Sequence, residues 1–382
     1  MSTAPGLRPG DPAPWFKAAS SNNPTFSFDT VAGRYVVLCF LGSSSSPQAQ
    51  AALAAVFRNR QLFDDEKLSF FGVTSDARDR DEGRVQQMVP GIRFFWDLDL
   101  AIARQYGVAD TPQQGASAPV AYRAQWIILD PMLRVVGVVP FDDAGRHAES
   151  AIAFLGRLPP IDQHARVPLF APVLVLPRVF EPEFCKRLID YYEEKGGVDS
   201  GFMRDVGGKT VGIVDYSHKR RSDCNIEDEG LKVAARQRIE RRLIPEIRKA
   251  FQFHVTRMER YIVVCYDADT GGHFNAHRDD TTYGTAHRRF AVTINLDADA
   301  YEGGDLCFPE FGSRRYRAPT GGAVVFSCSL LHKVWPVTAG KRYAFLPFLY
   351  DDAAARLREQ NNAKLADTVG KYKSGPVAAE AS

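Results

Sequence analysis

The sequence has no long apolar run, no excess of charge of either sign and few cysteines. Its longest apolar stretches, such as residues 35–40 (YVVLCF), are far too short to span a bilayer. The first residues lack the basic segment and apolar core of a secretion signal. The formal net charge is only +2, which gives no reason to expect a nucleic-acid or membrane partner. We therefore expect a cytoplasmic globular protein.

The six cysteines are scattered and form no C-x-x-C pair: they are Cys39, Cys185, Cys224, Cys265, Cys307 and Cys328. Most lie inside apolar runs, which indicates buried, reduced thiols and neither a disulfide framework nor a zinc site. At 382 residues the chain is longer than one hydrophobic core usually organises, so we expect two domains.

The first half alternates strand-like and helix-like patterns. Strand-like runs lie at residues 35–42, 68–75, 92–99, 125–130 and 134–141, and helical patterns at 47–62, 100–106 and 149–157. This alternation predicts an α/β domain that closes with a hairpin. The proline-rich residues 158–172 break both periods, so we place the domain boundary near residue 160.

The second half has a different pattern. Residues 182–195 and 231–251 fit helices, and short β-rich runs punctuated by Gly, Pro and Asp follow from residue 261 onward. Such runs predict a sandwich or barrel with the helices packed outside. Residues 353–372 fit one more helix before a tail of small residues that we expect to be disordered. The predicted parts are therefore residues 1–160, 161–352 and 353–382.

Residues 271–280 (GGHFNAHRDD) hold two histidines and two aspartates. His277 and Asp279 are one residue apart, so on an extended strand both side chains would emerge on the same face. His332, which opens another strand-like run, is the best third ligand. Two histidines and one carboxylate form the facial triad of non-haem Fe(II) oxygenases. Arg342, on the next run, could hold the remote carboxylate of 2-oxoglutarate in its planar fork.

Three nearby residues compete for the role of metal ligand. We expect His273 and His287 to be solvated or to lie behind the ligands, His287 especially, because Arg288 and Arg289 follow it in an expected loop. Asp280 could replace Asp279 only if the strand faced the other way.

Several linked motifs occur in order: APVLVLPRVFEPEFCKRLID, Tyr266 ahead of HFNAHRD, YEGGDLCFPE and PTGGAVVFSCSLLHKVWPVTAGKRY. Through them, residues 168–351 resemble the prolyl-4-hydroxylase-like branch of the Fe(II)/2-oxoglutarate-dependent dioxygenases. The resemblance implies a double-stranded β-helix (jelly roll) with His277, Asp279 and His332 as iron ligands. It implies Arg342 as the anchor of the 2-oxoglutarate C5 carboxylate. Fe(II), 2-oxoglutarate and O2 are the implied cofactor and cosubstrates, with ascorbate as a candidate reductant.

The same resemblance marks further candidate contacts. Tyr266 and Asn295 match positions that contact the cosubstrate in relatives, and Phe274 stands where relatives often have a tyrosine. Arg220 or Arg221, in HKRRSDCNI, is placed to contact a substrate, as loops near active sites often do.

The implied reaction is hydroxylation with release of succinate and CO2, because Asp279 occupies the position that related halogenases leave without a carboxylate. The substrate is open among a free amino acid, a peptide or protein side chain, and a small natural product. The alternative is a protein that senses or binds 2-oxoglutarate and iron without turnover.

In the first half, RPGDPAPWF, YVVLCFLG and APVAYRAQWIILDPMLRVVGVV with Arg123 carry a resemblance to the peroxiredoxin and thioredoxin-like superfamily. The attacking cysteine of that superfamily, which lies just after the first core strand, is missing, since the segment reads GSSSSPQAQ. We expect Cys39, inside the strand, to be structural. The serines could cap the following helix or bind an anion. A redox-inactive domain of this kind implies docking, homodimer formation or a protein partner.

Overall fold

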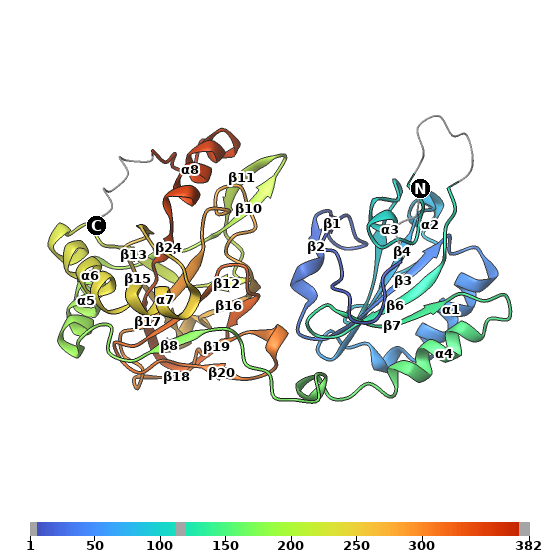
Figure 1. Cartoon of the computed structure of the whole chain (residues 1–382), viewed down its shortest axis with the longest axis horizontal. Coiled ribbons are helices and arrows are strands. Elements are labelled where there is room, and N and C mark those ends of the chain that lie inside the picture. The colour runs from blue at the N-terminus through green and yellow to red at the C-terminus, as the bar shows by residue number, and fades with distance from the viewer. Residues whose placement is uncertain (1–5, 112–119, 374–382) are drawn as a thin grey trace. The chain divides into compact units, whose positions relative to one another are not determined.

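The computed structural model describes residues 6–111 and 120–373. The chain forms two compact units (Figure 1): the first runs to Phe170 and includes Pro309–Ser313, and the second comprises Ala171–Phe308 and the residues from Arg314 onward. Within the described residues, no helix is long and apolar enough to cross a membrane. The domain limits expected at residues 160 and 352 remain predictions.

The first unit is built on a five-stranded sheet. Its strands are β3 (Tyr35–Gly42), β4 (Leu68–Thr74), β5 (Ile92–Trp96), β6 (Gln125–Leu129) and β7 (Val135–Pro140), in the order β5-β4-β3-β6-β7. The pairs β3–β4 and β4–β5 are parallel, whereas β6 is antiparallel to both β3 and β7. The pair β6–β7 is the predicted hairpin. The sheet has the thioredoxin-like arrangement that the sequence predicts.

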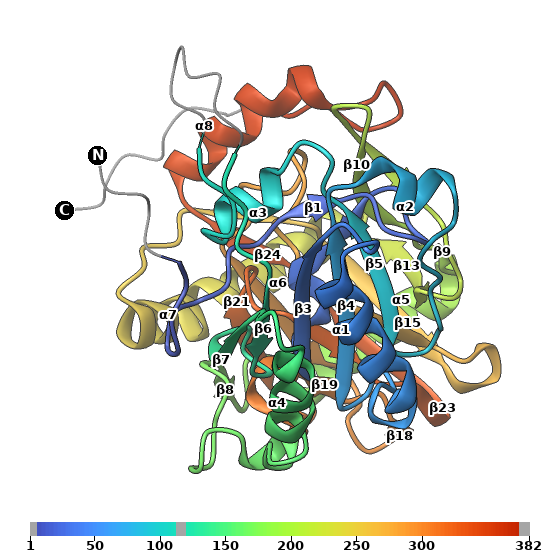
Figure 2. The ribbon, with the colours of Figure 1, turned by 90° about the vertical axis from the view of Figure 1, so that its right-hand side faces the viewer.

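Helices cover both faces of this sheet. The helices α1 (Pro47–Arg58) and α4 (Arg146–Leu155) lie on one face, where they pack against the odd-numbered side chains of β3 (Figure 2). Phe40 points to the opposite face, where its ring centroid lies 5.4 Å from that of Tyr106, at the end of α3 (Ala101–Gln105). Burial on both faces explains why β3 reads as a continuous apolar run. A short helix, α2 (Ala77–Asp81), was not predicted.

The second unit is built from two antiparallel sheets. Its strands are β8 (Leu174–Leu176), β9 (Val198–Asp199), β12 (Lys219–Arg220), β13 (Ser222–Asn225), β14 (Arg257–Glu259), β15 (Ile262–Asp267), β16 (His273–His277), β17 (Phe290–Asn295), β18 (Tyr301–Gly303), β19 (Leu306–Cys307), β20 (Arg315–Tyr316), β21 (Ala323–Ser327), β22 (His332–Val334), β23 (Val337–Phe345) and β24 (Phe348–Tyr350). The larger sheet has the order β14-β24-β17-β23-β15-β13-β9, with β18, β21 and β8 joined to it. The smaller sheet has the order β12-β16-β22-β19-β20. This is the predicted jelly-roll architecture.

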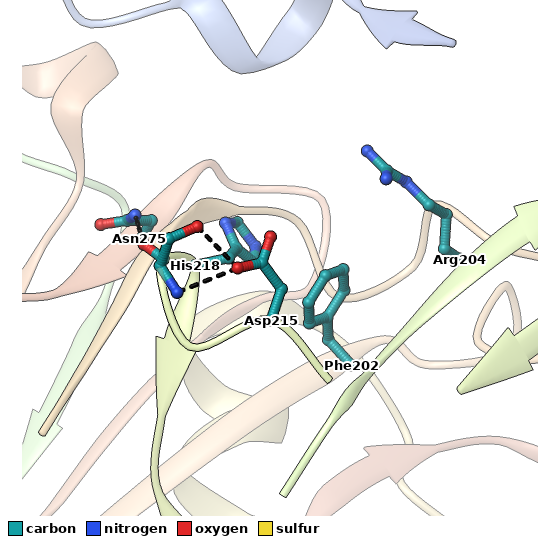
Figure 3. A pocket seen from close by; sticks show the side chains of 6 residues that line it. Phe202, Arg204, Asp215, His218 and Asn275 are labelled. Atoms are coloured by element: carbon teal, nitrogen blue, oxygen red, sulfur yellow. Dashed lines mark hydrogen bonds between the residues drawn. The ribbon is translucent and has the colours of Figure 1, made fainter. Parts of the chain in front are cut away.

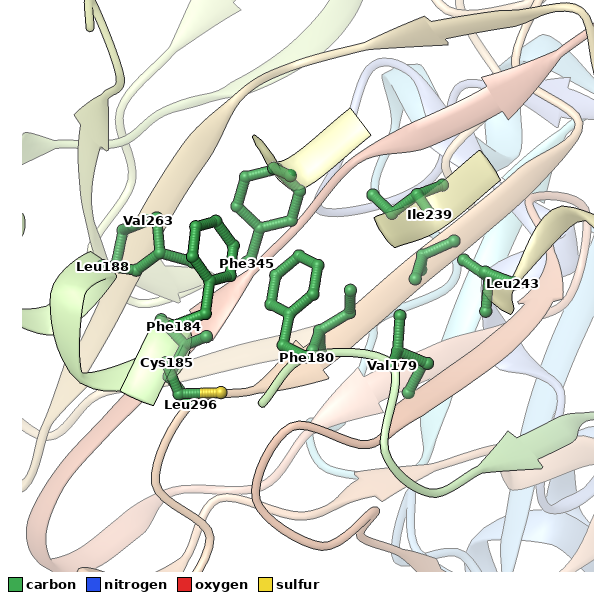
Figure 4. Packing of buried hydrophobic residues seen from close by; sticks show 14 of the residues in the cluster. Val179, Phe180, Phe184, Cys185, Leu188, Ile239, Leu243, Val263, Leu296 and Phe345 are labelled. Atoms are coloured by element: carbon green, nitrogen blue, oxygen red, sulfur yellow. The ribbon is translucent and has the colours of Figure 1, made fainter. Parts of the chain in front are cut away.

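Three helices cover the larger sheet: α5 (Pro182–Lys195), α6 (Glu229–Arg242) and α7 (Ile244–Phe251). Figure 4 shows their apolar side chains, such as Leu188 and Ile239, packed with Val263 and Phe345 of the sheet. The prediction of one helix over residues 231–251 was wrong. The helix breaks at Leu243 because Pro245, two residues further on, lacks the N–H needed to continue α6 and stands in the first turn of α7 instead.

A two-stranded hairpin precedes the smaller sheet and was not predicted. It consists of β10 (Phe202–Val206) and β11 (Lys209–Ile213), which pair only with each other among the described strands. Gly207 and Gly208 form its turn with φ values of 56° and 79°, which glycine adopts without steric cost.

The C-terminal helix is shorter than predicted. The helix α8 (Asp352–Gln360) continues only as one 3-10 turn, Asn361–Lys364, and no helix covers residues 365–372. The tail expected to be disordered includes residues 374–382, which lie outside the described residues.

Candidate metal centre

Three potential ligands converge where β16 ends and β22 begins, two neighbouring inner strands of the smaller sheet. His277 of β16 lies directly opposite His332 of β22. The Nε2 atom of His277 is 3.7 Å from Oδ1 of Asp279, and Nε2 of His332 is 3.4 Å from Oδ2. One ligand atom from each residue lies within 4.8 Å of the other two. The geometry thus joins the three residues that the sequence singled out.

Asp279 reaches this place by a route that the sequence did not predict. The strand β16 ends at His277, so Asp279 does not share a strand face with it. Instead, the backbone N–H of Asp279 donates to the carbonyl oxygen of Cys328, at 2.9 Å. This hydrogen bond fixes the carboxylate against the segment that leads into β22.

Backbone carbonyl groups orient both imidazoles. The Nδ1 atom of His277 lies 2.7 Å from the carbonyl oxygen of Asn275, and Nδ1 of His332 lies 3.0 Å from that of Leu330. We assign the proton of each ring to Nδ1, since a carbonyl can only accept, and this leaves each Nε2 lone pair free. Burial, together with the neighbouring His332, lowers the pKa of His277 well below its ordinary value. A neutral imidazole oriented in this way is the form that binds a metal.

Aromatic rings surround the two histidines. The Phe274 ring stacks on His277 with 3.5 Å between centroids, and the Phe326 ring lies edge-on to His332 at 4.6 Å. Phe274, which the sequence marked as a departure from the related pattern, therefore packs against a candidate ligand. These rings limit the access of water to the ligand atoms.

The structure places the three competing residues outside this cluster. The Nδ1 atom of His273 lies 2.7 Å from the carbonyl oxygen of Gly271, and the Asp280 carboxylate accepts a hydrogen bond from Ser329. His287 was expected to be solvated or to lie behind the ligands, and its burial excludes the solvated alternative. His287 is 1% exposed, and its Nε2 lies 3.2 Å from a carboxylate oxygen of Glu259. Its burial reflects an ionic cluster beneath β24, which the arginines after it in the sequence did not reveal.

Arg342 lies in β23 of the larger sheet and is 3% exposed. Its Nη2 donates to Oγ1 of Thr293, at 3.1 Å, but its Nε and Nη1 have no hydrogen-bond partner among the described residues. A buried guanidinium with unpaired donors is costly unless a carboxylate joins it. Thr293 was missed by the sequence reasoning, although the alternation along β17 places it on the same face as Asn295.

Tyr266 lies directly opposite Arg342 in the β15–β23 pair. Its hydroxyl is 3.5 Å from Nη1 of Arg221, which is buried and paired through two hydrogen bonds, of 2.6 and 2.7 Å, with the Asp223 carboxylate. Burial alone would raise the pKa of Asp223, but the charge of Arg221 holds it well below its usual range. The ion pair therefore stays charged and holds a donor beside the tyrosine.

Lys219 is a second buried basic side chain in this region. Its Nζ donates to Oγ of Ser200 and to the carbonyl oxygen of Gly201, at 2.7 and 2.6 Å, and lies 5.0 Å from the centroid of the Phe274 ring. Burial, followed by the charge of Arg221, lowers the pKa of Lys219 to about 6. No sequence pattern singles out this lysine.

Asn295, Arg220 and Arg221 are the remaining residues that the sequence marked as contacts of cosubstrate or substrate. Nδ2 of Asn295 donates to the carbonyl oxygen of Ala318, at 2.7 Å, and Oδ1 has no partner in the described part of the chain. Arg220 is exposed and donates to the carbonyl oxygen of Thr270, whereas Arg221 is buried in its ion pair. Contact of Arg220 or Arg221 with a substrate stays a prediction.

In the first unit, the start of α1 carries serine in place of a thiol. Ser46 caps the helix by accepting from the N–H of Ala49, and the N–H and hydroxyl of Ser44 both donate to the buried carboxylate of Asp79, at 2.8 and 2.5 Å. The anion at this helix start is thus a side chain of the protein. Arg123 pairs with Asp110 at 2.6 Å.

The cysteines of both units are free and buried. Cys39 is fully buried, and burial raises the pKa of its thiol well above the ordinary value. A thiol held in this state is a poor nucleophile.

Two family models match the chain. The AhpC/TSA family matches residues 9–135, and the 2OG-Fe(II) oxygenase superfamily matches residues 261–350, which include His277, Asp279, His332 and Arg342.

Several PKHD-type hydroxylases are similar to part of the chain. A PKHD-type hydroxylase from Maricaulis maris is 31% identical over 180 residues, which are 44% of this chain and 73% of the relative. A PKHD-type hydroxylase from Thioalkalivibrio sulfidiphilus is 35% identical over 78 residues, which are 19% of this chain and 35% of the relative. The chain thus spans about a third of the length of the latter relative. A solved prolyl hydroxylase from Trichoplax adhaerens, bound to a hypoxia inducible factor peptide, is 14% identical with a TM-score of 0.38, over 49% of this chain and 86% of that chain.

Proposed function

This chain belongs to the 2OG-Fe(II) oxygenase superfamily, and we propose that it is a hydroxylase whose Fe(II) is held by His277, Asp279 and His332. One observation carries the proposal: three ligand atoms within 4.8 Å of one another lie in the same jelly roll as a buried arginine with unpaired donors. A metal site alone fits many functions, and a buried guanidinium alone could be structural. Together they fit a ferrous ion and a dicarboxylic cosubstrate.

The donor set fits the metal. Two neutral imidazoles and one carboxylate are the ligands of non-haem Fe(II) oxygenases, and they leave open positions for cosubstrate and oxygen. The absence of thiolates from the cluster argues against a structural zinc site of the cysteine-rich kind. A carboxylate at Asp279 also favours hydroxylation over halogenation.

The residues of the chain divide the work. When bound, Fe(II) supplies the activation of O2 that is coupled to conversion of 2-oxoglutarate into succinate and CO2. Nε and Nη1 of Arg342 bind the C5 carboxylate of the cosubstrate, and the hydroxyl of Tyr266, held near Arg221, contacts the same molecule. Phe274 and Phe326 keep water from the ligand atoms. Ascorbate would serve as the reductant that keeps the iron ferrous.

The first unit has a supporting role in this proposal. It lacks a cysteine at the start of α1, and its only thiol, Cys39, is buried. We assign it to dimer formation or to the docking of a protein partner. A cytoplasmic location agrees with six reduced cysteines.

Succinate formation tests the proposal. The full chain is incubated with Fe(II), 2-oxoglutarate, ascorbate and a cell extract, and mass spectrometry follows succinate and products heavier by one oxygen. We expect His277→Ala and Asp279→Ala to abolish both signals and to abolish metal binding measured by calorimetry. His254→Ala is the matched control, because His254 is exposed and lies outside the cluster. Tight binding of 2-oxoglutarate without succinate in any extract would instead indicate a non-catalytic sensor.

A further inference from the structure

An open pocket of about 190 Å³ lies beside the metal centre. The residues that line it come from β10, from the loop after β11 and from β16: Phe202, Arg204, Asp215, Ser217, His218 and Asn275 (Figure 3). Pockets for drug-sized ligands usually measure about 300–1,000 Å³, so this one suits a small occupant.

A row of aromatic rings connects the pocket to the metal centre. The His218 ring lies 4.6 Å from that of Phe202 and 5.5 Å from that of Phe274, which in turn stacks on His277. Asn275 belongs to both places, since it lines the pocket and its carbonyl oxygen accepts the Nδ1 proton of His277. A molecule in this pocket would therefore lie against His218, whose ring centroid is 6.4 Å from that of the candidate ligand His277.

The pocket contains one cation, Arg204, and one anion, Asp215, and both side chains are exposed. Among the described residues, Arg204 makes no hydrogen bond or ion pair. The Asp215 carboxylate accepts from the hydroxyl and N–H of Ser217, at 2.6 and 2.9 Å, and these bonds, with a smaller contribution from the neighbouring His218, lower the pKa of its carboxyl. Figure 3 shows that the two charged side chains come from different segments, with the Phe202 ring beside Asp215.

We propose that this pocket binds a free amino acid as its zwitterion, with the carboxylate on Arg204 and the ammonium on Asp215. The inference rests on the proposed function, because it names the substrate class of that same site. A residue inside a peptide lacks both charges, and a neutral natural product would leave Arg204 and Asp215 unpaired. The ring of His218 and the ring of Phe202 would pack against the hydrocarbon part of the amino acid.

Calorimetry on the full chain tests the inference. The protein is loaded with Fe(II) and 2-oxoglutarate under nitrogen, and each of the proteinogenic L-amino acids is titrated in turn. The methyl ester and the N-acetyl derivative of the tightest ligand then remove one charge each. Because a hydrogen bond to a charged group is involved, we expect each derivative to bind about tenfold more weakly or worse.

Variants link each charge to its partner. Arg204→Gln should weaken binding of the parent amino acid about tenfold but leave the affinity for the methyl ester nearly unchanged, since the charge it recognises is already gone. Asp215→Asn should behave in the same way towards the N-acetyl derivative. Lys209→Gln, which removes a cation from the other strand of the same hairpin, should change neither affinity.

The outcomes separate this inference from the proposed function. An amino acid that binds with the expected charge dependence, in a protein that forms no succinate, supports the pocket and overturns the hydroxylase. Succinate formation stimulated by a peptide or an uncharged molecule, with no amino acid bound, overturns the pocket and retains the hydroxylase. Independent, additive losses from Arg204→Gln and the methyl ester also overturn it, because they show that the two groups do not meet.

Discussion

Tyr266 and Arg342 face each other across adjacent strands of the larger sheet, with the guanidinium carbon 5.2 Å from the centroid of the phenol ring. The arginine therefore has an aromatic neighbour and a hydroxyl neighbour, Thr293, but among the described residues no hydrogen-bond partner for its Nε and Nη1. This arrangement supports the proposed role of Arg342 in binding a carboxylate.

Replacing Arg342 should lower the affinity for 2-oxoglutarate and raise the stability of the protein that has no cosubstrate bound. Arg342→Met should raise the KM for 2-oxoglutarate about tenfold or more, because a charge-assisted pair is lost. The same variant should melt at a higher temperature than the parent when no cosubstrate is present, since an uncompensated buried charge is gone. Succinate assays and calorimetric melting measure the two effects. A lower melting temperature would mean that Arg342 stabilises the fold through contacts other than a carboxylate.

Removing the charge of Asp223 should destabilise the second unit strongly. Asp223→Asn leaves the buried Arg221 without its bidentate partner, and breaking a buried pair costs about 3–5 kcal/mol. Asp190→Asn breaks the exposed pair with Lys186, and such pairs are worth less than about 1 kcal/mol. Urea unfolding of both variants gives the comparison. Equal losses would contradict the buried character of the Arg221–Asp223 pair.

The buried Lys219 should make stability depend on pH. Its pKa is about 6 in the folded protein against 10.5 in a model compound, so between these values the unfolded chain binds one more proton. Stability then rises with pH across this window, by at most about 1.4 kcal/mol per pH unit from this group. The free energy of unfolding of the parent should therefore rise more steeply between pH 6 and 10 than that of Lys219→Met. Parallel curves for the two proteins would show that Lys219 keeps its charge on folding.

Because all six cysteines are buried, we expect the native protein to be inert towards thiol reagents. In the native state we expect no fast reaction with a chromogenic disulfide, because burial disfavours the thiolate of residues such as Cys39 and Cys328. After denaturation all six thiols of the chain should react. Peroxide should not be consumed. Rapid native labelling of one thiol, located by peptide mapping, would reveal a reactive cysteine and reopen a redox role for the first unit.

Much of the fold could be predicted because the local sequence pattern of many segments agrees with the place that each segment takes in the folded protein. The run 35–42 is apolar on both faces and became β3, and Pro182 begins α5 as expected of a proline in the first turn. Helical periodicity gave a wrong prediction where one residue overrides the pattern: Pro245, two residues after Leu243, divides the expected helix into α6 and α7. The hairpin of β10 and β11 carried a readable signal, the glycine pair at 207 and 208, which was not used.

The residues of the candidate site could be predicted from the sequence, but the hydrogen bonds and contacts that position them could not. His277, Asp279, His332 and Arg342 stood out as polar groups in apolar surroundings or in a recognisable spacing. The hydrogen bond from Asp279 to Cys328, and the contact of Thr293 with Arg342, depend on how distant strands meet. The burial of His287 against Glu259 likewise joins segments whose pairing no local pattern specifies.

The placement of His277 directly across from His332 has a mechanical consequence. An ion bound by both rings would link the neighbouring strands β16 and β22 at directly opposite residues. Backbone carbonyl oxygens already orient both rings, so binding of the ion would need little rearrangement of the two side chains. Release of the ion would leave the strand pairing intact. Amide hydrogen exchange in β16 and β22 should then slow when the ion enters, while the rest of the jelly roll keeps its rate.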